Sequence, residues 1–326
     1  MSGPRLTVVP LENGDVAALL ARLPAQAGVA QVLGPDGQSL LIGRPAHVRR
    51  WVATQLGAGP PPKKGKRPPT NLAPITSAVA FATTTTPFAQ RLAFERVMGR
   101  HVPLSKRRDL KPPVYLHLDP AARFPRLTVR PSGAAREHLY GPFRSRAAAQ
   151  AAIEALNTVF PLRPCDYAFE PAPDLALGLG CVFAQVRTCA APCLVRVSED
   201  DYRALAARAA AALGAGAGAT RGADLAAHVP LWVSAIAQAR GLVADRAGTT
   251  VELYPVVAGA VIEEEMAVTT TDGLEAAVAA LRWSAPSEVR DDTPWLVSWL
   301  HGKRTGTYLD LAPRETAAET AARLRG

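Results

Sequence analysis

The segment "FPLRPCDYAFEPAPDLALGLGCVFAQVRTCAAPC", from Phe160 to Cys193, contains every cysteine of a chain of 326 residues. Cys165, Cys181, Cys189 and Cys193 follow the spacing C-x15-C-x7-C-x3-C. Four thiolates gathered on loops can hold a tetrahedral Zn²⁺ or an iron–sulfur cluster. Zinc sites usually combine two close pairs, and here only the last two cysteines are close. The wide spacing therefore favours a cluster, with Zn²⁺ or unligated buried thiols as alternatives.

The bulk composition is that of a globular protein, with 48% hydrophobic and 20% charged residues. The length predicts two domains plus linkers. We expect no transmembrane helix, because there is no run of 18 apolar residues. The start "MSGPRLTVVPLENGD" does not resemble a signal peptide. We therefore expect a cytoplasmic protein with no membrane partner, in which clustered cysteines are more often metal ligands than disulfides.

Positive charge is concentrated in the first third of the chain, within a net charge of +9. Thirteen Lys or Arg residues and one acid, Glu95, lie between Gly37 and Arg108. Residues 200–326 carry twelve Lys or Arg against sixteen Asp or Glu. A basic region of this kind suits a polyanion, because neutralising phosphates releases counterions. A solubilising surface without a partner is the alternative.

The apolar patterns predict an α/β (α+β) fold. A short strand and a helix are expected in residues 1–23, and a hairpin around "GPDGQ" in residues 28–42. Further helices are predicted at 44–56, 87–100, 145–160, 198–213, 229–247 and 273–284. Further strands are predicted at 75–84, 113–119, 126–130 and within 249–269.

Four short motifs in the middle of the chain occur in a characteristic order. "FPRL" (Phe124–Leu127), "YGPF" (Tyr140–Phe143) and "FPLRPC" (Phe160–Cys165) precede a C-x7-C-x3-C element that ends in "APC". Together they resemble UvrC, the incision subunit of bacterial nucleotide excision repair, from about residue 24 to residue 202. The resemblance implies a GIY-YIG nuclease domain followed by a four-cysteine segment that binds a [4Fe–4S] cluster. The gap between Cys165 and Cys181 is longer than in that family.

The resemblance also indicates where a GIY-YIG active site would lie. The family's two tyrosines fall on Ala30 and Leu41, its arginine on Trp51, and its metal-binding glutamate on Phe94. Such a nuclease needs a tyrosine to activate water, cations to stabilise charge on the phosphorane, and a carboxylate to hold a divalent metal. Because all four positions carry apolar residues, we predict a degenerate nuclease fold whose incision activity is weak or lost.

An active, metal-dependent DNA endonuclease with a rearranged site is the alternative. Its catalytic residues would be Arg44, Arg49, Arg50 and Glu95, with His47 as a base and with Mg²⁺ or Mn²⁺ bound. Glu95 lies one position from Phe94 and would replace the family glutamate only after a rotation of the helix by about 100°. A third hypothesis is an interaction protein that does not bind DNA, in which the cysteine site is structural.

Contact with DNA does not require the catalytic residues, because phosphates can be tracked without reading sequence. The predicted DNA-binding residues are Arg44, Arg49, Arg50, Lys63, Lys64, Lys66, Arg67, Lys106, Arg107 and Arg108. Arg126, Arg144 and Arg146, in the UvrC-like segment, are additional candidates.

The sequence suggests four segments. These are an N-terminal extension (1–23), a GIY-YIG-like domain (24–110) with a basic Pro/Lys loop at 58–70, a UvrC-like linker and cysteine segment (111–199), and a C-terminal helical, then α/β, module (200–326). The last segment is more similar to Cho, the short UvrC homologue, than to the RNase H-like nuclease and helix–hairpin–helix pair of UvrC. The resemblance implies DNA as a partner, and UvrB or UvrA as further ones, although the predicted helix at 229–247 lacks the UvrB-binding pattern.

Overall fold

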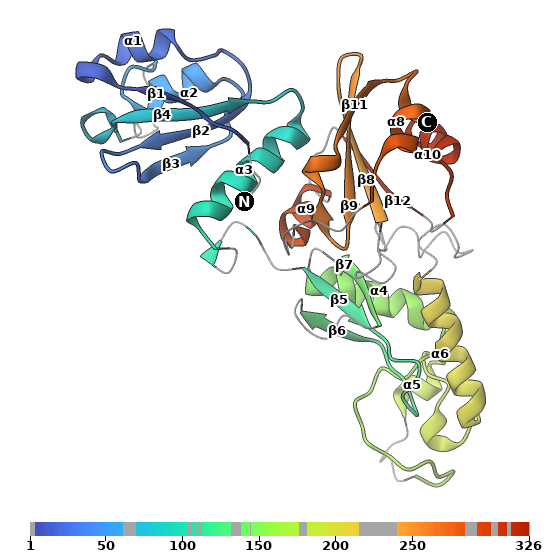
Figure 1. The fold of residues 1–326 in the computed structure, drawn as a ribbon. Coiled ribbons are helices and arrows are strands. Elements are labelled where there is room, and N and C mark those ends of the chain that lie inside the picture. Colours follow the sequence, from blue (N-terminus) through green and yellow to red (C-terminus); the bar gives the residue numbers. More distant parts are fainter. Residues whose placement is uncertain are drawn as a thin grey trace.

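The computed structural model describes residues 4–60, 70–103, 106–107, 110, 113–131, 138–143, 145–175, 181–214, 240–283, 292–300, 306–311 and 314–325. Within these ranges the chain forms three sheets with helices packed against them (Figure 1). The predicted α+β class is confirmed, and the paired strands are antiparallel rather than mixed. No described helix has the length and apolar character needed to cross a membrane.

The first sheet has the strand order β1-β4-β2-β3. The predicted hairpin is confirmed as β2 (Gly28–Leu33) and β3 (Ser39–Gly43), while β4 (Ala78–Thr83) pairs with both β2 and β1 (Thr7–Pro10). Helices α1 (Val16–Ala21) and α2 (Val48–Gln55) bury their apolar residues on one face. Helix α3 (Pro87–His101) covers the other face and contacts β2 and β3.

The middle sheet has the order β6-β5-β7. The predicted strand pair is confirmed as β5 (Val114–His117) and β6 (Thr128–Pro131), with β7 (Leu139–Phe143) on the other side of β5. Helices α4 (Arg146–Val159) and α6 (Glu199–Gly214) share one buried core with this sheet. Each helix directly follows a serine, Ser145 or Ser198, whose hydroxyl caps it by accepting a backbone N–H.

Tyr202 of α6 joins the two Phe-Pro motifs of the middle domain. Its side chain is fully buried, and its hydroxyl donates to the Pro125 carbonyl (3.0 Å) and accepts from the Arg163 N–H (2.7 Å). Arg163 in turn donates to the carbonyls of Phe124 (3.0 Å) and Tyr167 (2.8 Å). Burial raises the pKa of Tyr202 well above its usual value, so the phenol stays neutral. These bonds hold the backbone on both sides of Cys165.

The third sheet has the order β10-β9-β8-β12, with β11 also paired to β9. Its strands are β8 (Arg240–Ala247), β9 (Thr250–Val257), β10 (Ala260–Val261), β11 (Ala267–Thr270) and β12 (Thr307–Leu311). Helices α8 (Leu274–Ala280) and α10 (Ala317–Arg325) pack on one face. Helix α9 (Thr293–Leu300) packs on the other face together with α3.

The prediction of a helix over 229–247 is wrong for residues 240–247, which form strand β8; residues 229–239 lie outside the described ranges. The physical reason is that β8 is buried on both faces. Leu242 and Ala244 face α8 and α10, whereas Val243 faces α3 and α9. A strand covered on both faces has a continuous apolar run, and such a run does not alternate, so its pattern cannot be told from that of a buried helix.

Helix α3 is enclosed by the first and third sheets (Figure 1). Val97 packs toward β2, while Phe88 and Leu92 pack against Val243 and Trp295 of the third sheet region. A helix that is apolar on opposite sides must be buried on both. The C-terminal module is therefore part of the packing that holds the last helix of the N-terminal domain.

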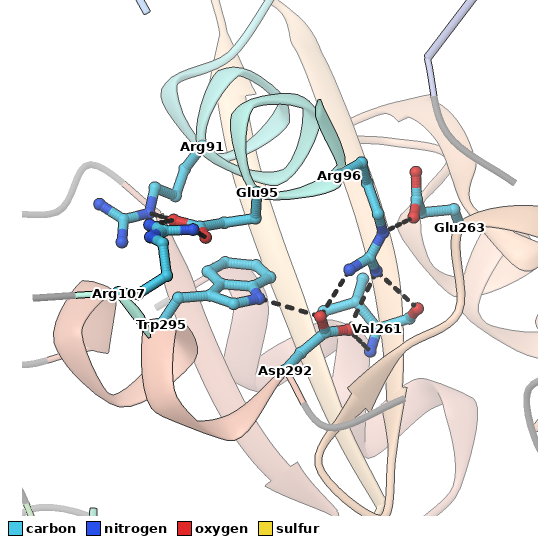
Figure 2. A network of polar contacts seen from close by, with 8 residues as sticks. All are labelled: Arg91, Glu95, Arg96, Arg107, Val261, Glu263, Asp292 and Trp295. Carbon is cyan, nitrogen blue, oxygen red and sulfur yellow. Dashed lines mark hydrogen bonds and ion pairs between the residues drawn. The ribbon is translucent and has the colours of Figure 1, made fainter. Parts of the chain in front are cut away.

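The guanidinium of Arg96 anchors this packing (Figure 2). Its Nη1 and Nη2 donate to the two Asp292 oxygens at 2.5 and 2.9 Å, and its Nε donates to Glu263. Asp292 also accepts from the Val261 N–H and from Trp295 Nε1, each at 2.9 Å. Burial would lower the pKa of Arg96, but the two carboxylates outweigh it and raise the pKa above its ordinary value.

Two acids of the third sheet hold the N-terminus of α3. The Asp245 carboxylate accepts the Phe88 N–H at 2.8 Å. The Glu252 carboxylate accepts from Thr85, from Thr86 (2.6 Å) and from the Tyr254 hydroxyl (2.8 Å). Asp245 and Glu252 are directly opposite each other on β8 and β9. Carboxylates at this position satisfy free N–H groups and interact favourably with the helix dipole.

We predict that Arg96→Met lowers the free energy of unfolding by about 3–5 kcal/mol, because it leaves the Asp292 carboxylate buried without its cation. Urea unfolding followed by tryptophan fluorescence measures the change, since Trp295 donates to the same carboxylate. Arg100→Met is the matched control, because Arg100 lies exposed in the last turn of the same helix. Equal unfolding midpoints for the two variants would contradict the role given to Arg96.

We predict that Tyr202→Phe destabilises the middle domain by about 1–3 kcal/mol, because the buried Arg163 N–H and Pro125 carbonyl both lose their partner. Amide hydrogen exchange of the segments around residues 125 and 163 should increase. Tyr167→Phe is the control, since that side chain is 49% exposed. Unchanged exchange in Tyr202→Phe would show that this hydroxyl does not hold the two motifs together.

Candidate functional site

Three of the four positions predicted from the resemblance to correspond to GIY-YIG catalytic residues lie in one apolar cluster. Ala30 of β2 is fully buried, and Leu41 of β3 and Trp51 of α2 pack against the same core. Gly43 lies directly under the Trp51 ring, where a Cβ at residue 43 would come within 2.4 Å of a ring carbon. These side chains fill the space between the sheet and α2 with apolar atoms.

Phe94 lies on the opposite face of the first sheet. Phe94 is part of helix α3 and packs with Val97 of the same helix and with Val29 and Ile42 of the sheet. The guanidinium carbons of Arg44 and Arg107 each lie 5.8 Å from the centre of its ring, which is within the range of cation–π contact. The structure therefore does not bring Phe94 together with the positions of Ala30, Leu41 and Trp51.

Glu95 is engaged by two arginines (Figure 2). One carboxylate oxygen pairs with Arg91 Nε at 2.7 Å, and the other accepts from Arg107 Nη1 at 2.8 Å. The side chain is buried, with a residue exposure of 5%. A divalent metal at Glu95 would have to displace both guanidinium groups, and removing one partner of a buried ion pair is strongly unfavourable. As arranged, Glu95 acts as the centre of a buried ion-pair triad.

Three further polar side chains near the first sheet, those of His47, Gln31 and Arg49, also contact other groups of the protein. His47 is exposed, and its Nδ1 lies 2.7 Å from the Ala25 carbonyl. Gln31, buried on β2, contacts the His101 ring with its amide nitrogen at 2.9 Å. Arg49 donates from Nε to the Leu23 carbonyl at 2.7 Å. Gln31 and His101 were not among the predicted site residues, because nothing in their spacing indicates that they meet.

The predicted DNA-binding residues divide into three groups. Arg44, Arg49, Arg50 and Lys106 are exposed. Arg107 is 6% exposed, and its guanidinium is bonded to Glu95 inside the protein. The remaining predicted residues, and the additional candidate Arg144, lie outside the described ranges. The remaining predicted residues are Lys63, Lys64, Lys66, Arg67 and Arg108.

The four cysteines are unpaired and lie in the loop-rich part of the middle domain. Cys181 precedes the short helix α5 (Val182–Gln185), and Cys193 lies in a single 3₁₀ turn, Pro192–Leu194. Cys189 and Cys193 are buried, and Cys165 and Cys181 are half-buried. The Cys189 Sγ accepts a hydrogen bond from the Ala191 N–H at 3.3 Å.

The other three cysteines affect the pKa of the Cys189 thiol. Burial raises the pKa of the Cys189 thiol to about 11, and Cys165, Cys181 and Cys193 raise it further against the effect of the Ala191 N–H. Burial raises the pKa of Cys193 as well. Among the described residues, no set of three or more His, Cys, Asp or Glu side chains is arranged at metal-ligand geometry.

The donor set fits a thiolate-bound metal group in its chemistry. Four sulfur donors are the ligands that iron–sulfur clusters and structural zinc share. Ala191 and Val195, on either side of Cys193, have left-handed backbone conformations (φ of 53° and 56°). Such conformations cost about 1–3 kcal/mol for residues with a Cβ and are kept where surrounding interactions compensate. A bound group that draws Cys189 and Cys193 together would supply that compensation.

Comparison with known proteins finds a family match in the middle of the chain. Residues 113–212 match the family described as "UvrC/Cho excinuclease, middle domain", and this range contains all four cysteines. No solved structure matches the chain.

Curated relatives named UvrABC system protein C match a larger part of the chain. The protein of Geobacter metallireducens is 31% identical over 197 residues, which is 59% of this chain and 30% of that protein. Those of Novosphingobium aromaticivorans and Sphingopyxis alaskensis are each 28% identical, over 216 and 193 residues, covering 65% and 58% of this chain and 32% and 29% of theirs. The chain thus spans less than a third of the length of these relatives. Through residues 113–212 and these relatives, the chain is similar to the UvrC/Cho proteins.

Proposed function

We propose that this protein binds DNA in nucleotide excision repair and that its incision activity is weak or lost. The observation that carries the proposal is the state of Glu95, the carboxylate nearest to the family's metal position. Both of its oxygens are engaged by buried arginines, and the position itself is occupied by Phe94. The name shared by the curated relatives, UvrABC system protein C, supports the repair setting.

The apolar residues at the remaining nuclease positions point the same way. Ala30, Leu41 and Trp51 belong to the packed core on the α2 face of the sheet. Losing one general base or one electrostatic donor typically lowers a rate by about 10²–10⁴, and the losses here involve several groups. The fold remains stable without these groups because the replacements add apolar contacts.

DNA binding is proposed on the basis of charge that is not used for folding. Arg44, Arg50 and Lys106 are exposed and lie in the region where the sequence has thirteen Lys or Arg residues and one acid. Contacts to phosphates would release counterions, so the affinity should fall steeply with salt. This proposal is independent of whether the nuclease is active.

Cys165, Cys181, Cys189 and Cys193 are proposed to hold a [4Fe–4S] cluster, with Zn²⁺ as the alternative. Such a group crosslinks loops that have few apolar contacts, and its binding is coupled to their folding. In this chain the hydrogen bond from Ala191 to Cys189 and the network of Tyr202 and Arg163 would orient the ligand loops. UvrB or UvrA is proposed as a partner only through the UvrABC relatives. The segment 229–247, which lacks the UvrB-binding pattern, forms strand β8 over residues 240–247.

A second candidate, an active endonuclease with a rearranged site, is favoured by one observation. Arg44 and Arg107 flank Phe94, the residue before the only acid between Gly37 and Arg108, and Arg107 is bonded to that acid. If Arg91 and Arg107 released Glu95, that carboxylate could hold Mg²⁺ or Mn²⁺ beside cations that stabilise a phosphorane.

We predict that the protein binds a fluorescein-labelled duplex with one bulky base adduct and that this binding weakens with salt. With Mg²⁺ or Mn²⁺ it should nick the duplex no faster than Glu95→Gln. Fluorescence anisotropy gives the affinity, and denaturing gel electrophoresis gives the nicking rate. Nicking that disappears in a folded Glu95→Gln protein would favour the second candidate. Undetectable binding at low salt would instead reject the proposed function and favour an interaction protein.

We predict that protein purified without oxygen is brown and contains about four irons per chain. Cys193→Ser should lose most of the iron and of the visible absorption, because its buried sulfur is one of four ligands. Ser198→Ala is a control that changes a nearby hydroxyl and leaves every sulfur in place. One zinc per chain and no iron would show that the cysteines form the alternative site.

A further inference from the structure

A pocket of about 390 Å³ lies in the middle domain, at the edge of its sheet. One wall is the segment from Arg126 through strand β6 to Arg130, and the other is the first turns of α4. Pro164, next to Cys165, closes one end. The volume is within the range of small-molecule sites. The pocket is distinct from the nuclease-like sheet and from the cysteine ligands.

Cations dominate the polar lining. Arg126, Arg130 and Arg146 come from different parts of the walls, and none of the lining residues is acidic. The side chains of these three arginines form no ion pair with any residue in the described part of the chain. Three cations around one pocket repel one another, and a bound anion would relieve that repulsion. Arg130 and Arg146 are exposed, so an anion can reach them from solvent. Burial and then the charge of Arg130 lower the pKa of His117 on β5, as expected for an unneutralised guanidinium.

The walls are rigid. Leu127 and Ile153 line the pocket and are each 5% exposed, because they also belong to the core between β6 and α4. Pro164 follows Arg163, whose backbone and guanidinium are fixed by Tyr202, Phe124 and Tyr167. A site held by a strand, a helix and a fixed turn loses little entropy when it binds a ligand.

The mixture of charged and apolar groups that line the pocket favours a phosphodiester as its ligand. Guanidinium groups bind phosphate oxygens in a bidentate manner. Arg146 and Gln150 lie in the first two turns of α4, where the helix dipole favours an anion. The apolar walls, Leu127, Val129 and Ile153, offer contact to a sugar, which a free inorganic anion would not use.

We propose that the pocket between β6 and α4 binds a phosphodiester of the nucleic-acid backbone. The inference rests on the proposed function, since it assigns one DNA contact to the middle domain rather than to the nuclease-like sheet. It would bring the bound strand next to the loop of Cys165. Any change in that loop would then affect how tightly the strand is held.

The first test is the Arg126→Gln/Arg146→Gln double variant in the full chain. Loss of two phosphate contacts should weaken binding to duplex DNA about tenfold or more and reduce the slope of log K against log salt by nearly two. Arg208→Gln is the control, because Arg208 is exposed on α6 of the same domain and does not line the pocket. It should change each quantity by less than half as much. Circular dichroism verifies that the variants are folded.

The second test adds a charge without removing an arginine. Gln150→Glu places a carboxylate in the pocket, whereas Ala147→Glu places the same charge on an exposed position of the same helix, outside the lining. Gln150→Glu should weaken DNA binding severalfold more than Ala147→Glu. Equal effects would show that only the net charge matters and would overturn the inference.

The outcomes separate the inference from the proposed function. If the wild type binds DNA and the double variant binds equally well, the pocket inference is overturned and the proposed function remains. If the wild type does not bind DNA, both are rejected. A poly-glutamate peptide is the third probe. If it binds the wild type more tightly than DNA does, and the double variant does not bind it, the pocket is a protein-binding anion site, which also overturns the inference.

Discussion

The contact between Arg96 and Asp292 joins residues 196 positions apart and links the two ends of the fold. Arg96 lies on the last helix of the nuclease-like domain, and Asp292 directly precedes α9 of the C-terminal module. Both side chains are almost fully buried. A buried charge is tolerated only with its partner, so this pair requires that α3 and the third sheet stay packed. The apolar contacts of Phe88 and Leu92 and the acids that hold the N-terminus of α3 act in the same direction.

This packing also determines how the polar residues of α3 are used. Helix α3 has neighbours on two sides, and its polar residues are used to hold them: Arg96 for the third sheet, and Glu95 for Arg91 and Arg107. These charged groups are committed to ion pairs inside the protein. The middle domain has the opposite character. Its Phe-Pro motifs are fixed by Tyr202 and Arg163, while Arg126, Arg130 and Arg146 have no acidic partner within the part of the chain that the structure describes.

Local patterns predicted most of the elements. The hairpin of β2 and β3, the strand pair β5 and β6, and the helices α3, α4 and α6 all follow from periodicity, turn residues and caps close in sequence. The order of Phe-Pro and cysteine motifs was sufficient to indicate the UvrC-like middle domain. The error at β8 arose because Leu242 and Val243 face two different cores, which removes the alternation that marks a strand.

Long-range polar contacts could not be predicted. Nothing near Arg96 in the sequence indicates Asp292, and nothing near Thr86 indicates Glu252, since those pairs form only after the sheets assemble. Thr85 and Thr86 directly precede α3, but their acceptor, Glu252, lies 167 and 166 residues away in the sequence. Likewise, Arg126, Arg130 and Arg146 are separated in sequence and become neighbours only across the β6–α4 groove.

Because α3 packs between two sheets, it can complete its packing only after the C-terminal module has been synthesised. At roughly 5–20 residues per second, the 196 residues between Arg96 and Asp292 take about 10–40 s to translate. During most of that interval α3 has only one of its two packing surfaces, because both carboxylate partners of Arg96, Glu263 and Asp292, are synthesised near its end. The middle domain, whose core is made entirely from residues in between, can fold first. Its cysteine loops can therefore reach their folded positions before the C-terminal module has been synthesised.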